Sequence, residues 1–163
     1  MSAAQDVQAL YERHYLSLVR LALHLVDEPA AAEDVVQDVF AALSGKELPR
    51  EPVRYLQRAV VNRCRSALRR RRVARAFLTR PQPLELVESA DADALRAERR
   101  RTLVAAIAAL PHRQREVVVL RFYEDLSVAE IAELLGISAG AVSSSLTRAL
   151  DALQNRIGDP HDH

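Results

Sequence analysis

The stretch from Leu126 to Leu153, LSVAEIAELLGISAGAVSSSLTRALDAL, has the pattern of two short helices joined by a turn. In a helix-turn-helix the first helix needs a small residue where the second helix crosses it, and Ala132 meets that need. Gly136 can adopt the left-handed conformation of the turn without a steric penalty. Val142 is expected to fill the angle between the helices. This spacing favours a DNA-binding motif over an ordinary helical hairpin, which is the alternative.

The two helices also carry start signals. Ser127, with Glu130 three residues later, matches a capping box, and Ser138 suits the N-cap of the second helix. The outward residues of that helix are small or polar, which permits a close approach to a major groove. This predicted duplex-DNA surface consists of Ser138, Ala139, Gly140, Ser143, Ser144, Thr147 and Arg148. The expected buried face consists of Ile131, Leu134, Leu135, Ile137, Leu146 and Leu150.

The composition predicts an all-α protein, because the 163 residues include few glycines, no tryptophan and little alternation of β-branched and aromatic residues. The length suits one or two small domains. The single Cys64 cannot form an internal disulfide, which fits a reducing compartment. No apolar run approaches the roughly 18 residues of a membrane span, and the N-terminus lacks the apolar core of a signal peptide. We therefore expect a cytoplasmic protein without membrane insertion.

The net charge of +1 conceals a strong segregation of charge. Residues 27–38 contain five acidic side chains and no basic one. Residues 46–75 contain eleven lysines and arginines against only Glu47 and Glu51. An acidic block followed by a basic block suggests one face for a protein partner and another for nucleic acid.

Three helices are expected in the first half of the chain. The first spans Gln5 to Val26, the second runs from Asp27 or Glu28 to about Leu43, and the third begins at Pro52. On the second helix Val35, Val36, Val39, Phe40 and Leu43 share the inward side, and Glu33, Asp34, Gln37 and Asp38 share the outward side. The acidic outward side is either solvated surface or a docking surface for a basic partner.

The third helix combines an inward apolar side with an outward basic side. Its inward residues are expected to be Val53, Leu56, Ala59, Val60 and Leu68. The arginines of the outward side could neutralise phosphates. Tyr55 could stack on an unpaired base, although it also fits a core position, and Asn62 could hydrogen-bond a base edge.

A break in the pattern divides the chain. Pro81, Pro83 and the acidic ELVESADAD predict a linker over residues 79–94. The expected domains are residues 1–78 and 95–157, with a frayed tail at 158–163. In the second domain we expect helices from Leu95 to Leu110 and from His112 to Tyr123 ahead of the helix-turn-helix. Their expected packing residues are Leu103, Val104, Ile107 and Leu110, then Val117, Val118, Leu120 and Phe122.

Three motifs in this order resemble the extracytoplasmic-function group of bacterial sigma factors, and the resemblance covers nearly the whole chain. AAEDVVQDVF at 31–40 is similar to the region 2 helix that binds the clamp coiled coil of core RNA polymerase. PVRYLQRAVVNRCRSALRRRR at 52–72 is similar to the helix that captures the unpaired non-template strand of the minus-ten element. Residues 110–150 resemble region 4, whose recognition helix enters the major groove of the minus-thirty-five element.

The resemblance implies roles for particular residues. Asp34, Gln37, Asp38 and Phe40 match positions that contact polymerase or support that contact, and Asn62 matches a base-reading position. The loop at 44–50 matches one that holds a flipped promoter base. The implied minus-ten DNA-binding set is Lys46, Arg50, Arg54, Tyr55, Arg58, Asn62, Arg63, Arg65, Arg69 and Arg70. The implied partners are core RNA polymerase, through its clamp coiled coil and flap, promoter DNA in duplex and single-stranded form, and an anti-sigma factor.

The chain departs from the family pattern at three places. Tyr55 stands where many members have tryptophan, residues 64–66 stand where many carry an acid, and Ser143 and Ser145 stand where basic residues are common. No part matches the extra N-terminal region or the middle DNA-binding domain of housekeeping sigma factors.

Two other functions fit part of the sequence. A helix-turn-helix regulator without polymerase would use residues 126–153 and leave the acidic and basic helices unexplained. An enzyme acting on nucleic acid would need a nucleophile with its base, a phosphate-binding glycine loop or a metal-ligand cluster, and the sequence contains none of these patterns. We therefore expect no enzyme activity, no cofactor and no metal.

Overall fold

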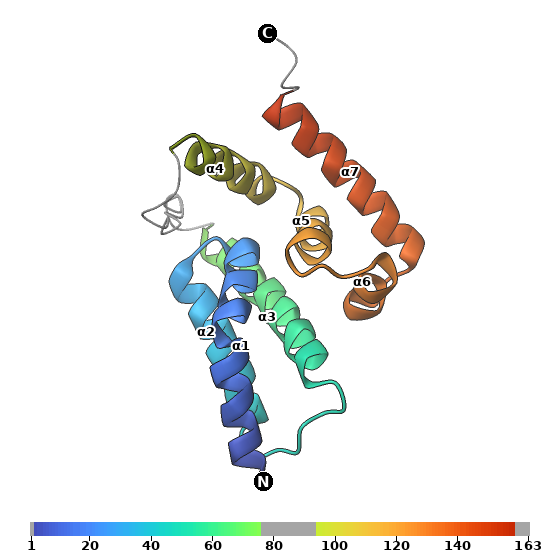
Figure 1. Ribbon diagram of the computed structural model, residues 1–163. Coiled ribbons are helices and arrows are strands. Elements are labelled where there is room, and N and C mark those ends of the chain that lie inside the picture. The colour runs from blue at the N-terminus through green and yellow to red at the C-terminus, as the bar shows by residue number, and fades with distance from the viewer. Residues whose placement is uncertain (1, 76–93, 159–163) are drawn as a thin grey trace. The chain divides into compact units, whose positions relative to one another are not determined.

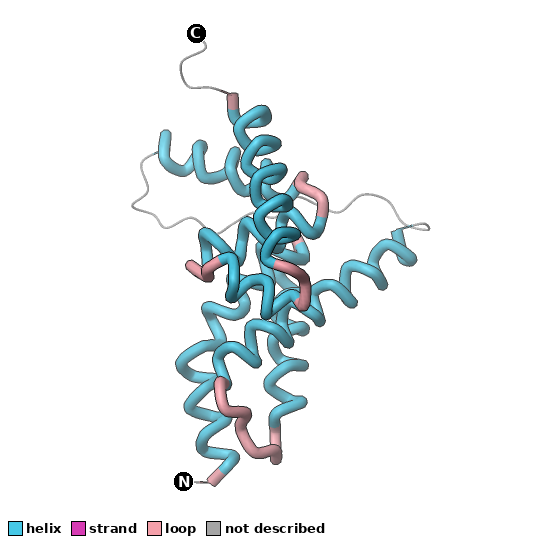
Figure 2. The backbone as a smooth tube through the Cα atoms, turned by 90° about the vertical axis from the view of Figure 1, so that its right-hand side faces the viewer, coloured by secondary structure: helices cyan, strands magenta, loops and turns pink. Residues whose placement is uncertain are grey.

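The structure, a computed structural model, describes residues 2–75 and 94–158. Over these residues the chain forms helices and no strand, which confirms the predicted all-α class (Figure 2). The chain divides into two compact units, residues 1–84 and 85–163, which we describe separately. Apart from Ala94 the predicted linker lies outside the described residues, as does the predicted tail beyond Gly158.

Unit 1 is a bundle of three helices that all contact one another: α1 (Ala3–Val26), α2 (Pro29–Leu43) and α3 (Pro52–Arg75) (Figure 1). A capping box between Ser2 and Gln5 starts α1, and Asp27 ends it in the left-handed conformation, with a φ of 62°. Proline occupies the first turn of α2, as expected. The tight reversal at Asp27 is what places α2 directly against α1.

The core of unit 1 contains the expected apolar residues of α1 and α2, including Leu21, Leu25, Val36 and Val39. On α3 the prediction for Val53 was wrong, because 39% of this residue is exposed in the first turn, one turn before the buried Leu56. The buried side of α3 is also wider than predicted and includes Gln57, Val61 and Cys64. This width follows from packing against two helices, α1 and α2, instead of one.

Unit 2 contains α4 (Ala94–Ala108), α5 (His112–Val118), the π-helical turn η1 (Val119–Tyr123), α6 (Val128–Leu135) and α7 (Ala139–Ile157). The α6 and α7 helices form the predicted helix-turn-helix. Ala132 and Val142 are buried, and Gly136 ends α6 with a φ of 68°. Ser127 and Glu130 form the predicted capping box, and the Ser138 side chain caps α7. The local signals in the sequence therefore place both helix starts correctly.

Three apolar residues predicted to pack in unit 2 are exposed instead: Leu103, Phe122 and Leu150. The wide turn η1, closed by a bond from the Glu124 amide to the Val119 carbonyl, shifts the helical register and turns Phe122 outward. Leu103 and Leu150 lie outside the buried cluster, which consists of Ala106, Leu110, Val118, Ala149 and Leu153.

A buried carboxylate contacts two side chains of its own helix, α5. Glu116 is fully buried, with its side chain 3.3 Å from His112 Nε2 and 3.7 Å from an Arg113 nitrogen. The neighbouring Arg115 donates to the Ala108 carbonyl at the end of α4. The Arg115 bond joins α5 to the end of α4, and both helices pack against α7.

Candidate nucleic-acid interface

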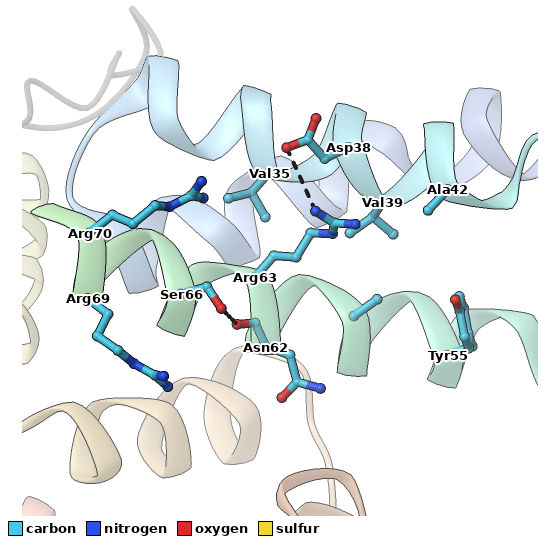
Figure 3. A pocket seen from close by; sticks show the side chains of 11 residues that line it. Val35, Asp38, Val39, Ala42, Tyr55, Asn62, Arg63, Ser66, Arg69 and Arg70 are labelled. Atoms are coloured by element: carbon cyan, nitrogen blue, oxygen red, sulfur yellow. Dashed lines mark hydrogen bonds and ion pairs between the residues drawn. The ribbon is translucent and has the colours of Figure 1, made fainter.

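An open groove of about 770 Å³ runs between α2 and α3 in unit 1 (Figure 3). Aliphatic side chains from both helices form part of its lining, and polar and charged side chains form the rest. The lining residues are Val35, Asp38, Val39, Ala42, Tyr55, Ala59, Asn62, Arg63, Ser66, Arg69 and Arg70. The groove thus combines an apolar surface with an aromatic ring, an amide and three guanidinium groups.

The groove gathers half of the predicted minus-ten set. Tyr55, Asn62, Arg63, Arg69 and Arg70 line it and are all exposed. Tyr55 is 41% exposed, which decides against the core position that its sequence context left open. Lys46, Arg50, Arg54, Arg58 and Arg65 lie outside the lining, with Arg54 and Arg65 half-buried. We call the five residues of the minus-ten set that line the groove, Tyr55, Asn62, Arg63, Arg69 and Arg70, the basic face of α3.

The predicted polymerase-contact residues on α2 divide into surface and core. Asp34, Gln37 and Asp38 are exposed and form what we call the acidic face of α2. Phe40 is 5% exposed and packs edge-on against Tyr11, with ring centroids 5.1 Å apart. This buried position suits the supporting role that the resemblance allowed for Phe40.

The acidic and basic faces meet at one ion pair. Asp38 Oδ2 lies 3.9 Å from an Arg63 guanidinium nitrogen across the groove (Figure 3). This pair was not predicted from the sequence, because Asp38 and Arg63 lie on different helices and only packing brings them together. Ser66 was not predicted as a groove residue either. It donates a hydrogen bond to the Asn62 carbonyl one turn earlier. The four-residue spacing between Asn62 and Ser66 was the sequence signal that could have indicated this hydrogen bond.

The arginine run at the end of α3 does not have a single role. Arg71 is hydrogen-bonded to the Val26 carbonyl at the end of α1, at 2.6 Å, and its other terminal nitrogen lies 3.2 Å from Glu28. A cation suits this place, because the last carbonyls of a helix carry partial negative charge. Arg71 therefore ties α3 to the α1–α2 corner, whereas Arg69 and Arg70 line the groove.

The predicted duplex-DNA residues share the exposed side of α7 in unit 2. All seven, from Ser138 to Arg148, are exposed, and we call them the recognition face of α7. Two of its hydroxyl groups make bonds within the helix: Ser138 accepts from the Ala141 amide, and Thr147 donates to the Ser143 carbonyl. A Cβ added to Gly140 would meet only the Ser138 hydroxyl, at 3.9 Å. The fold therefore does not require glycine there.

Two further observations concern the described part of the chain. No group of three or more His, Cys, Asp and Glu residues there is arranged to hold a metal ion. No helix there is long and apolar enough to cross a membrane.

Comparison with protein families identifies both units. Residues 10–74 match the family described as Sigma-70 region 2, and residues 100–153 match Sigma-70, region 4. The RNA polymerase sigma-E factor of Streptomyces coelicolor is 35% identical over 147 residues, which cover 86% of this chain and 80% of that protein. The ECF RNA polymerase sigma factor SigL of Mycobacterium tuberculosis is 32% identical, over 91% of this chain and 86% of that protein.

Solved structures share this fold. The sigma factor RpoE of Bartonella quintana, solved with the anti-sigma factor NepR, matches with a TM-score of 0.74 over 98% of this chain and 99% of that chain, at 20% identity. CnrH, solved with the cytosolic domain of CnrY, matches with a TM-score of 0.64 at 26% identity, over 93% of this chain and 86% of that chain. The match to RpoE, at 20% identity, shows similarity of fold alone.

Proposed function

Because the chain belongs to the extracytoplasmic-function group of the sigma-70 family, whose members direct transcription initiation by RNA polymerase, we propose that its two units divide promoter recognition between them. Residues 1–78 act as region 2, which docks on core polymerase and holds the melted minus-ten element. Residues 95–157 act as region 4, which binds the minus-thirty-five duplex. The groove beside the basic face of α3 is the observation that carries this division.

The acidic face of α2 docks on core polymerase. Asp34, Gln37 and Asp38 are exposed at helical spacing, so they can meet a basic helical surface such as the clamp coiled coil. Phe40 supports this face from below by packing on Tyr11. Unit 2 makes the second polymerase contact, at the flap.

The basic face of α3 holds the unpaired strand. Tyr55 offers a ring for stacking, Asn62 an amide for a base edge, and Arg63, Arg69 and Arg70 offer charge for phosphates. Lys46 and Arg50, in the exposed loop before α3, and Arg54, Arg58 and Arg65 extend this surface. Stacking on Tyr55 and the contact of Asn62 with a base edge form only with unpaired bases, so they shift the equilibrium from closed to open promoter. The chain itself makes and breaks no bond and needs no cofactor.

The recognition face of α7 binds the upstream duplex. Its small side chains, Ala139, Gly140, Ser143 and Ser144, let the helix lie deep in a major groove. Arg148 and the amide end of the helix near Ser138 are suited to phosphates. This anchor holds the promoter while unit 1 captures the unpaired bases.

An anti-sigma factor regulates the chain in the cytoplasm. The support comes from relatives, since RpoE was solved with the anti-sigma factor NepR and CnrH with the cytosolic domain of CnrY. A protein that covers the acidic face of α2 would block docking on polymerase, and this is the simplest point of control.

Run-off transcription tests the proposal. The full chain is mixed with bacterial core polymerase and a promoter library, and the variants Asp38→Arg and Asn62→Ala are compared with the wild type. We expect defined start sites with the wild type only. Asp38→Arg should fail to bind core polymerase, and Asn62→Ala should bind it and initiate poorly. Specific binding of the chain alone to duplex, without any transcript, would favour a regulator that works without polymerase.

A further inference from the structure

The two proposed binding surfaces of unit 1 share one electrostatic contact. Asp38 belongs to the acidic face of α2, and Arg63 belongs to the basic face of α3. Their side chains are joined at 3.9 Å, with Arg63 46% and Asp38 62% exposed (Figure 3). Both groups line the groove, so each can be reached by a partner from solvent.

The pair opposes DNA binding in the free chain. A carboxylate next to a guanidinium cancels part of its attraction for phosphate. It also holds the guanidinium toward α2. A basic group from a partner that pairs with Asp38 would remove both effects at once.

Resting on the proposed function, we infer that Asp38 restrains Arg63 in the free chain and that docking of a basic polymerase surface on Asp38 releases Arg63 to a DNA phosphate. The ion pair thereby couples polymerase binding to strand capture. The pair therefore weakens DNA contacts of the free chain and allows them on the assembled polymerase.

The exposure of both groups limits the size of the effect. Exposed ion pairs are weak, so breaking this one should change DNA affinity only about two- to five-fold. The direction of the change is decisive. If Asp38 instead positioned Arg63 for DNA, its removal would weaken binding.

The test measures binding of the free full-length chain to a fluorescent single-stranded DNA of random sequence, about twelve nucleotides long, by anisotropy at several salt concentrations. We expect Asp38→Asn to tighten binding about two- to five-fold and to steepen the salt dependence by about 0.7, which corresponds to one added phosphate contact. Glu33→Gln is the matched control, because Glu33 is an exposed acid of α2 outside the groove lining. It removes the same charge and should change affinity less than about 1.5-fold.

A second substitution isolates the pair. In an Arg63→Gln background, Asp38→Asn should give no more than the small gain seen with Glu33→Gln. Weaker binding by Asp38→Asn, or an equal gain in both backgrounds, would overturn the inference. Circular dichroism of each variant checks that the bundle remains folded.

A measurement with core polymerase tests the coupling. At polymerase concentrations that saturate both proteins, wild type and Asp38→Asn should bind the same oligonucleotide equally, because polymerase already occupies Asp38 in the wild type. A difference that persists at saturation would overturn the coupling. The variant Asn62→Ala tests the proposed DNA face separately, because it should lose the oligonucleotide binding that the wild type shows. A failure of the Asp38–Arg63 coupling and a failure of the DNA site therefore give different results.

Discussion

The DNA surfaces of α3 and α7 differ in the chemistry they present. The basic face of α3 offers three arginines, an aromatic ring and an amide beside a groove. The recognition face of α7 offers hydroxyls, a methyl group and a glycine, with Arg148 as its one charged residue. The first is built for charge and stacking, as an unpaired strand demands, and the second for close fit to a duplex. The two should therefore respond differently to salt and to substitution.

The largest difference should appear in salt dependence. Replacing Arg58, Arg69 and Arg70 by glutamine should lower the salt slope of single-strand binding by about 2, because three phosphate contacts are lost. Over a roughly four-fold rise in salt, the wild type should then lose about twenty-fold more affinity than this variant. Arg148→Gln should lower the slope of duplex binding by only about 0.9. Equal slope changes on the two surfaces would remove the proposed distinction.

Close fit on α7 predicts the second effect. Ser144→Glu should weaken duplex binding about tenfold, because it places a carboxylate and added bulk against the phosphates of the groove. Gln154→Glu adds the same charge to an exposed position in the C-terminal half of α7 and should have little effect. The comparison can be made by electrophoretic mobility shift with a minus-thirty-five duplex selected by the wild type. A similar loss in both variants would argue against a localised recognition face.

The arginine run of α3 supplies a third test. Arg71→Ala should lower the free energy of unfolding of unit 1 by about 1 kcal/mol, since it removes the bonds to the Val26 carbonyl and Glu28. Arg70→Ala, at an exposed position, should leave stability almost unchanged. Urea unfolding of both variants measures the difference. If Arg70→Ala proved the more destabilising, the division of this run into structural and DNA-binding residues would be wrong.

Acidification should have the smallest effect. Burial lowers the pKa of His24 from its ordinary 6.5, so the fold favours the neutral imidazole. The stability that this residue contributes is complete above pH 6.5 and is lost as the pH falls below that value toward the folded-state pKa. His24→Gln should make unit 1 less sensitive to this change. Hydrogen exchange of α1, followed by mass spectrometry at neutral and acidic pH, measures it, and an unchanged sensitivity would contradict the assignment.

Local patterns predicted much of the fold. The capping residues Ser127 and Ser138, the turn at Gly136 and the proline of α2 act through neighbours in sequence, so periodicity and spacing were sufficient to identify them. The inward residues of α2 were also predicted correctly, because one helix face determines them.

The features that the sequence did not predict depend on packing between helices. The Asp38–Arg63 pair and the groove arise because α2 and α3 lie side by side, and no spacing within one helix encodes that contact. The exposure of Phe122 depends on the π-helical turn η1, which no spacing or capping pattern of residues 119–123 indicates. Arg71 looked like the rest of its run and is distinguished only by the α1–α2 corner beside it.

The most direct test of the central claim compares promoter melting on two templates. Wild type and Asn62→Ala, each assembled with core polymerase, are placed on a duplex promoter and on the same promoter with a pre-melted minus-ten element, and permanganate reactivity of thymines reports the open bubble. We predict that Asn62→Ala binds the closed duplex as the wild type does, opens about tenfold less of it, and regains most of the loss on the pre-melted template. Equal opening of the duplex by both proteins would contradict strand capture by the basic face of α3.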